Sequence, residues 1–197
     1  MRFMKGVASV PALLLFGSGS LVMAQDTPSA PAATPTPGAE GWMVIGSKGP
    51  TPRNTEIRTP GNLAIREARY RVHEGRLLLQ VELYERPTGD STLSLRWRLA
   101  GASLPTYALD YYFANRRVVF GRHAITDPTR GVRRTEPIAQ PGIKVSLTGS
   151  FVDIELPLEA LRPEGATWEI QVMTTYLGRD NLYWAVDWLG WTRLVLR

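Results

Sequence analysis

From residue 41 to the C-terminus, apolar and polar residues alternate with a period close to two. This pattern is typical of β-strands with one buried face, because successive side chains of a strand point to opposite sides of the sheet. A sustained helical period is not found anywhere in the sequence. The pattern predicts strands at residues 68–72, 77–83, 93–99, 107–113, 117–122, 143–147, 151–156, 168–176 and 191–196.

Turn residues separate these strands. The sequence His73-Glu74-Gly75-Arg76 predicts a hairpin turn in which Gly75 takes a positive φ, and Gly149-Ser150 predicts another turn. Residues 156–161 have room for one helical turn before Pro163. About eight to ten short strands at this spacing predict an all-β fold, an antiparallel β-sandwich with a jelly-roll or immunoglobulin-like two-sheet architecture.

The first 24 residues are typical of a secretory signal peptide. Arg2 and Lys5 precede an apolar stretch, and small residues at its end predict cleavage after Ala24. A retained membrane anchor is the alternative, but the apolar stretch is short and Pro11 interrupts it. We therefore expect an extracytoplasmic protein, which is periplasmic, displayed on the cell surface or secreted.

Residues 25–40 read QDTPSAPAATPTPGAE and predict a disordered linker. Proline removes backbone donors, and Ala, Ser and Thr offer too little apolar area to repay the entropy of ordering. The segment is either a spacer that holds the domain away from an anchor point or an N-terminal remnant without a role. Residues 41–197 then form a single domain by size.

Composition excludes several classes of protein. The chain has no cysteine, which removes disulfides, thiolate metal sites and cysteine nucleophiles. The net charge of +5 falls to +3 when Arg2 and Lys5 leave with the signal peptide, so nucleic acid is not an expected partner. A cluster of arginines predicts a solvated loop, with an acidic polymer as the alternative partner: Arg116, Arg117, Arg122, Arg130, Arg133 and Arg134.

Support for a reaction or a metal is weak. His73 and His123 are the only histidines, and each is expected to be exposed or packed rather than a metal ligand. Asp153 and Glu155 alternate with apolar residues, which is the ordinary pattern of a half-solvated sheet. No nucleophile elbow, phosphate-binding loop or zinc-binding helix motif occurs in the sequence, so we expect no catalytic residues, no metal and no cofactor.

Three landmarks together resemble a known superfamily. They are Gly41-Trp42, the strand-turn-strand of residues 68–83, and the sequence VDIELPLEAL at residues 152–161. This order is similar to that of the DOMON-like superfamily, in particular to sandwiches like carbohydrate-binding module family nine. The resemblance implies a two-sheet sandwich and a carbohydrate ligand. Some members hold calcium in an Asp-rich turn, but the comparable Thr59-Pro60-Gly61-Asn62 has no carboxylate, so a calcium site is not supported here.

The most suggestive local feature is an aromatic segment near the C-terminus. Sugar-binding modules use flat aromatic faces to stack on pyranose rings and polar groups to bond the hydroxyls. Alternatively, Trp184, Val186 and Trp188 occupy every second position of one strand, so that they lie on the same face and the two tryptophans fill the core. The predicted ligand-binding residues are Trp184, Trp188, Trp191, Asp187, Arg179, Asp180 and Asn181.

We therefore expect an exported, non-catalytic binding module for a glycan or another cell-envelope polymer. One alternative is a structural or protein-interaction component of a cell-surface layer. A second is a small outer-membrane β-barrel, which fits less well because the chain ends on Arg197 and not on an aromatic residue. Alternating arginines also indicate sheet faces turned to water: Arg69, Arg71, Arg96 and Arg98. The sequence predicts no transmembrane helix in the processed chain and leaves the oligomeric state open.

Overall fold

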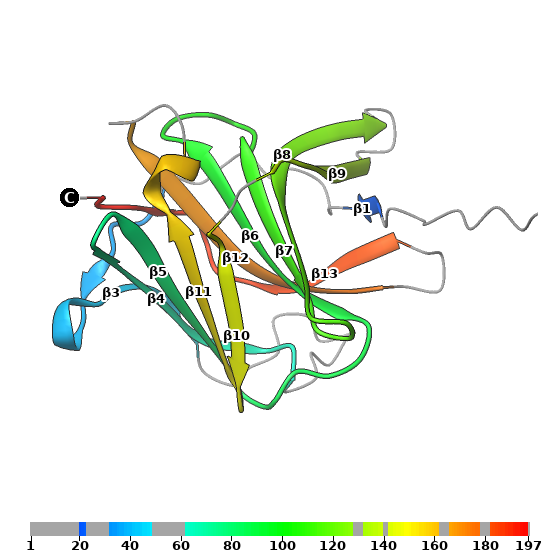
Figure 1. Ribbon diagram of the computed structural model, residues 1–197, viewed down its shortest axis with the longest axis horizontal. Helices are drawn as coiled ribbons and strands as arrows, with labels where there is room; N and C mark the ends of the chain where they lie inside the picture. The colour runs from blue at the N-terminus through cyan, green and yellow to red at the C-terminus, as the bar shows by residue number, and fades with distance from the viewer. Residues whose placement is uncertain are drawn as a thin grey trace, which may run out of the picture.

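A computed structural model describes residues 20–22, 32–48, 62–127, 132–139, 142–161, 166–177 and 182–196. Within these residues the protein is all-β, and its helical segments are two short 3₁₀ turns, η1 (Ala39–Gly41) and η2 (Leu158–Ala160). The strands form two sheets that pack face to face (Figure 1). The predicted all-β class and two-sheet antiparallel architecture are confirmed.

The smaller sheet has the strand order β10-β11-β5-β4-β3-β2, and every neighbouring pair is antiparallel. Its consecutive strands β4 and β5 are joined by the predicted hairpin turn, in which Glu74 and Gly75 have φ values of 48° and 70°. The strands are β2 (Thr36–Pro37), β3 (Met43–Ser47), β4 (Ile65–His73), β5 (Arg76–Leu83), β10 (Lys144–Thr148) and β11 (Phe151–Pro157).

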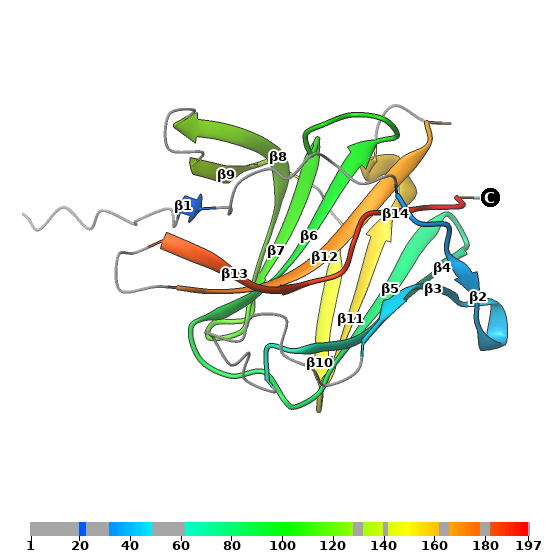
Figure 2. The same cartoon turned by 180° about the vertical axis from the view of Figure 1, so that it is seen from behind.

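The larger sheet has the order β13-β1-β9-β8-β7-β6-β12-β14, and β13 pairs with β12 as well. The pairs are antiparallel except for β1 and β13, which run parallel. Figure 2 shows β13 and β14 following each other along one edge of β12. The strands are β1 (Ser20–Val22), β6 (Ser91–Leu99), β7 (Tyr107–Tyr112), β8 (Arg117–Asp127), β9 (Val132–Pro137), β12 (Trp168–Leu177), β13 (Leu182–Trp188) and β14 (Thr192–Arg193).

The hydrophobic core lies between the two sheets. Alternate residues of the central strands face it, as the period of two predicts, and each fully buried aliphatic side chain stabilises the fold by about 1.5–3 kcal/mol. On the larger sheet Trp97 packs edge-on against Phe120, with ring centroids 6.3 Å apart. The core side chains that are at most 1% exposed include Leu77, Leu79, Val81, Leu83, Leu93, Leu95, Trp97, Val152, Ile154, Ile170 and Val172.

Strand β6 is buried on both faces, which the alternation did not predict. Arg96 and Arg98, expected to face water, are 2% and 3% exposed, so that prediction is wrong. By contrast, Arg69 and Arg71 on β4 are only half-buried, and their guanidinium groups lie over Trp42 at 5.0 Å and 4.8 Å from the ring centroid. The larger sheet curls, since β13 pairs with β12 and is joined through β1 to β9, and the face of β6 that points away from the core lies on the sheltered side of this curl (Figure 1).

Strands β8 and β9 come very close together at Gly121, in the middle of β8. At this residue β8 is paired with β7 through Ala108 and with β9 through Pro137. A Cβ at this position would lie 1.9 Å from the carbonyl oxygen of Glu136, so only glycine allows β9 to come this close. Beyond Gly121 the strand continues to Asp127, five residues past its predicted end.

The N-terminal part of the chain also contributes to the sheets. Ala33, in the segment predicted as a linker, accepts a hydrogen bond from the Arg193 amide (2.9 Å) and donates one to the Trp191 carbonyl (2.8 Å). Pro35 is buried, and β2 pairs with β3. Residues 32–40 are therefore packed on the domain, whereas residues 25–31 lie outside the described part of the chain.

We predict that Gly121→Ala lowers the free energy of unfolding by about 3 kcal/mol, because β9 must move away from β8 to admit the methyl group. For a domain of this size the melting temperature should fall by roughly 6–12 °C. Gly190→Ala is the matched control, since a Cβ there meets nothing within 4 Å. Equal melting temperatures for the two variants, measured by circular dichroism, would contradict the role given to Gly121.

Candidate functional site

The face of the larger sheet that points away from the core, called the outer face below, brings exposed aromatic and buried polar residues together. Cross-strand pairing sets Trp188 of β13 opposite Met173 of β12, Met173 opposite Ser94 of β6, and Ser94 opposite Asp110 of β7. Trp188 is 39% exposed, whereas Met173, Ser94 and Asp110 are 2%, 1% and 7% exposed. The outer face thus runs from an exposed indole to a sheltered carboxylate.

Asp110 is the centre of a buried polar network. Its Oδ1 accepts hydrogen bonds from Ser94 Oγ (2.6 Å) and Arg96 Nη1 (2.8 Å), and its Oδ2 accepts one from Thr135 Oγ1 (2.6 Å). Thr135 belongs to β9, two strands away from β7 in the sheet order, so it reaches Asp110 only because the sheet curls in this region. Both carboxylate oxygens are therefore engaged within the protein.

These contacts keep Asp110 ionised. Burial by itself raises the pKa of Asp110, but the attraction of Arg96 and the hydrogen bonds from Ser94, Thr135 and Arg96 outweigh it and hold the pKa below its ordinary value. The charge pair of Asp110 and Arg96 is therefore kept at neutral and at mildly acidic pH.

A second ion pair lies on the same face, one strand over. Arg98 of β6 is directly opposite Glu169 of β12, and its Nε lies 2.7 Å from Glu169 Oε2. The guanidinium group of Arg98 also lies over the indole of Trp191, at 4.2 Å from the ring centroid. This cation–π contact fixes the indole plane of Trp191, which is half-buried.

Trp188 and Trp191 lie along the same edge of β12 and on the same face. Trp188 pairs with Met173, while Trp191 stacks on the arginine that pairs with Glu169. Met173 and Glu169 are four residues apart in one strand and therefore share a face. Both indoles therefore lie on the outer face along one edge of β12, and the strand positions beside them, Met173 and Glu169, are about 13 Å apart.

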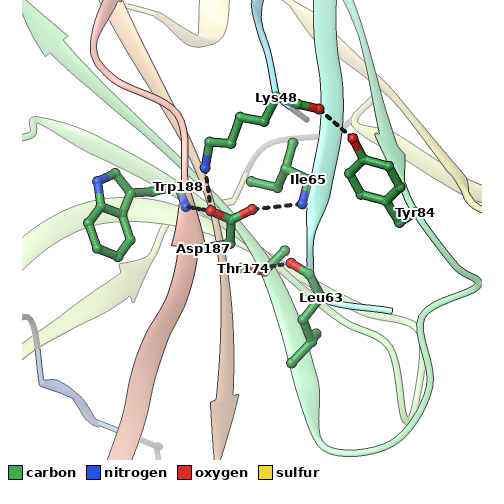
Figure 3. A network of polar contacts seen from close by, with 7 residues as sticks. All are labelled: Lys48, Leu63, Ile65, Tyr84, Thr174, Asp187 and Trp188. Carbon is green, nitrogen blue, oxygen red and sulfur yellow. Dashed lines mark hydrogen bonds and ion pairs between the residues drawn. The ribbon is translucent and has the colours of Figure 1, made fainter. Parts of the chain in front are cut away.

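Asp187, a predicted ligand-binding residue, points the other way, between the sheets (Figure 3). Its Oδ1 forms an ion pair with Lys48 and accepts a hydrogen bond from the Trp188 amide (2.9 Å), and its Oδ2 accepts one from the Ile65 amide (2.8 Å). Thr174 adds a second tie between the sheets by donating a hydrogen bond to the Leu63 carbonyl (2.6 Å). In the described structure Asp187 holds the sheets together and supports Trp188 from behind.

The expectation that Trp184 and Trp188 lie on the same face of one strand fails because β13 contains a β-bulge. In the pairing with β12, Asp187 is opposite Thr174 and Ala185 is opposite Thr175, so Val186 has no partner. The two tryptophan positions consequently do not share a face. The side chain of Trp184 lies outside the described part of the structure, as do the predicted site residues Arg179, Asp180 and Asn181.

The other charged candidates do not converge on one place. Arg116, Arg117 and Arg122 are exposed, whereas Arg133 and Arg134, predicted to lie in a loop, belong to strand β9. His73 is exposed at the hairpin tip, 3.6 Å from Glu74. Within the described residues, no three His, Asp or Glu side chains come together in a way that could hold a metal ion.

Sequence reasoning missed the two buried ion pairs. The sequence did contain a pattern that fits these ion pairs. Arg96 and Arg98 alternate with large apolar residues in one predicted strand, and Asp110 lies between two large apolar residues in the next. That pattern is equally typical of a water-facing sheet, and only the curl of the sheet distinguishes the two cases.

A scan against models of known protein families found no match, and neither did searches among curated proteins and solved structures. Of what the resemblance to the DOMON-like superfamily implied, the two-sheet antiparallel sandwich is confirmed. Across the described residues, none of the helical segments is long and apolar enough to cross a membrane.

We predict that Asp110→Asn lowers the free energy of unfolding by about 3 kcal/mol, because it leaves Arg96 buried without a compensating charge. Chemical denaturation at pH 7 measures the change. Asp90→Asn, in the exposed turn before β6, is the matched control and should change the free energy by less than about 0.5 kcal/mol. A loss no larger than that of the control would show that the ion pair does not stabilise the fold.

We also predict that the difference in stability between the wild type and Asp110→Asn depends on pH. Since the pKa of Asp110 is lower in the folded state, its stabilisation is fully present above the unfolded-state pKa of about 3.9 and is lost as the pH falls toward the folded-state value. The gap between the two proteins should therefore be larger at pH 7 than at pH 3. Denaturation curves at both values test this, and a gap that widens in acid would have the wrong sign.

Proposed function

We propose that this protein is an exported, non-catalytic module that binds a glycan on the outer face of its larger sheet. The proposal is carried by one observation: Trp188 and Trp191, both partly open to solvent, lie on the outer face along the same edge of β12. Indole faces stack on the apolar faces of pyranose rings, and exposed aromatic rings are costly to keep in water without a ligand to cover them.

The ring of Trp191 and the backbone at Trp188 are held in place before any ligand arrives. Trp191 is fixed by the guanidinium group of Arg98, which is itself held by Glu169. Trp188 follows Asp187, and its backbone amide is bonded to that anchored carboxylate. A platform that is already ordered loses little conformational entropy on binding, which favours affinity for a ligand as flexible and polar as a glycan.

The acidic groups of this face support a binding role rather than hydrolysis. Glycoside hydrolysis uses one carboxyl group that is protonated at working pH and a second one that faces the scissile bond. Asp110 is kept ionised and is enclosed by three donors, and Glu169 is 3% exposed and paired with Arg98. Neither carboxylate is in a position to reach a polysaccharide at the surface.

The location belongs to the same proposal. The predicted signal peptide at residues 1–24 favours export, and the absence of cysteine in the whole chain means that burial between sheets, not disulfides, must stabilise the exported domain. A structural or protein-interaction component of a cell-surface layer is the second candidate, and the slot described in the next subsection favours it.

We predict that Trp188→Ala and Trp191→Ala each weaken glycan binding at least tenfold, a loss of about 1.4 kcal/mol that is typical of one aromatic stacking contact. A glycan array would first find the ligand, and titration calorimetry with the corresponding oligosaccharide would then measure the dissociation constants.

Trp42→Ala is the matched control for this experiment. Trp42 is also a half-buried tryptophan covered by arginines, but it lies beside the smaller sheet against Arg69 and Arg71. The Trp42→Ala variant should bind the oligosaccharide with the same dissociation constant as the wild type. Equal losses in all three variants would indicate a general effect on folding, and the absence of binding to any glycan would favour the interaction role instead.

A further inference from the structure

A short strand fills a slot between two edges of the larger sheet. Strand β1 pairs with β13 in parallel, with Ser20, Leu21 and Val22 opposite Leu182, Tyr183 and Trp184. On its other side it pairs antiparallel with β9, where Leu21 is opposite Arg133 and Val22 is opposite Val132. Figures 1 and 2 both place β1 between the free ends of β9 and β13, on the side where the sheet curls.

The residues that fill the slot belong to the predicted signal peptide. Ser20–Val22 lies inside the predicted signal peptide, whose cleavage is expected after Ala24. We propose that export vacates the slot between β9 and β13, and that the processed protein uses it to bind an extended segment of a second polypeptide by β-strand addition.

The geometry of the slot limits what can enter it. Neighbouring strands are about 4.8 Å apart, so two edges that flank one strand are about 10 Å apart and admit one extended backbone. Each edge presents N–H and C=O groups that lose their partners when β1 leaves, and open strand edges readily take up another chain. Two edges acting on the same incoming strand offer twice the hydrogen bonds of an ordinary exposed edge.

The protein's own new N-terminus is a poor replacement for β1. Residues 25–31 contain Pro28 and Pro31, which lack the N–H that a strand must donate. A few residues further on, Ala33 is held by hydrogen bonds to Trp191 and Arg193 at another edge of the sheet. A second polypeptide is therefore the favoured occupant, with a proline-free segment that runs parallel to β13, as Ser20-Leu21-Val22 does.

The slot is separate from the proposed glycan surface. It uses the first residues of β13, Leu182–Trp184, whereas the aromatic platform begins at Trp188 at the other end of that strand. The proposal adds a protein partner to the proposed function, and either one can fail without the other.

The first measurement is the intact mass of the full-length chain after export and purification. The expected mass is that of a chain beginning at Gln25. A purified protein that retains Ser20–Val22 would overturn the proposal, because the slot would then be permanently filled by β1.

The second measurement is the binding of a fluorescent peptide of residues 18–24, Ser-Gly-Ser-Leu-Val-Met-Ala, to the exported protein. Binding should slow hydrogen exchange at the amides of both Val132–Arg133 and Leu182–Trp184. A peptide with Leu21→Pro lacks one N–H at the centre of the strand and should bind at least tenfold more weakly.

The same measurements define the contrary result. Equal binding of the two peptides, or protection of only one of the two edges, would exclude strand addition in the slot. No detectable binding of the wild-type peptide at millimolar concentration would overturn the proposal as well. Binding of the peptide by Trp188→Ala should be unchanged, which keeps this test independent of the glycan test.

Discussion

Strand β6 is buried on both faces, and most of the architecture follows from how each face is satisfied. On the core side Leu93, Leu95 and Trp97 supply apolar area. On the outer side Arg96 and Arg98 are buried charges, which are strongly unfavourable unless a carboxylate and further hydrogen bonds compensate them. The two neighbouring strands each provide that carboxylate, Asp110 from β7 and Glu169 from β12.

The ion pairs also specify how the strands align. Ser94 is directly opposite Asp110, and Arg98 is directly opposite Glu169. A slip of one residue in either pairing would turn a carboxylate into the apolar core and leave an arginine without its partner. Hydrophobic alternation alone tolerates a slip of two residues better than a charge pair does, so the polar face adds specificity that the core does not supply.

The curl of the larger sheet connects this network to the two proposed binding surfaces. Thr135 of β9 reaches Asp110 of β7 across β8 and completes its set of donors, and Gly121 leaves room for the close approach of β9 to β8. The far part of β9 faces β13 across the single strand β1. The indoles of Trp188 and Trp191 remain at the rim of the sheltered surface, where a ligand can reach them.

The sequence alone predicted the strands with clear alternation, the Glu74-Gly75 hairpin turn and the two-sheet class, because these depend on local periodicity and on the conformational freedom of glycine. It also pointed to Trp188 and Trp191 as aromatic residues of interest. Strand β9 was missed, since its polar sequence gains stability from pairing with β8 rather than from an apolar face.

Only the tertiary structure decided which charged residues are buried and which indoles are exposed. A β-bulge at Val186 separates Trp184 from Trp188, and the neighbouring Asp187 turns inward to Lys48 and Ile65 instead of toward a ligand. Arg96 and Arg69 have similar sequence surroundings, yet one is enclosed by a curled sheet and the other lies over Trp42. Periodicity assigns a residue to a face of a strand, but whether that face meets water depends on how distant strands bend around it.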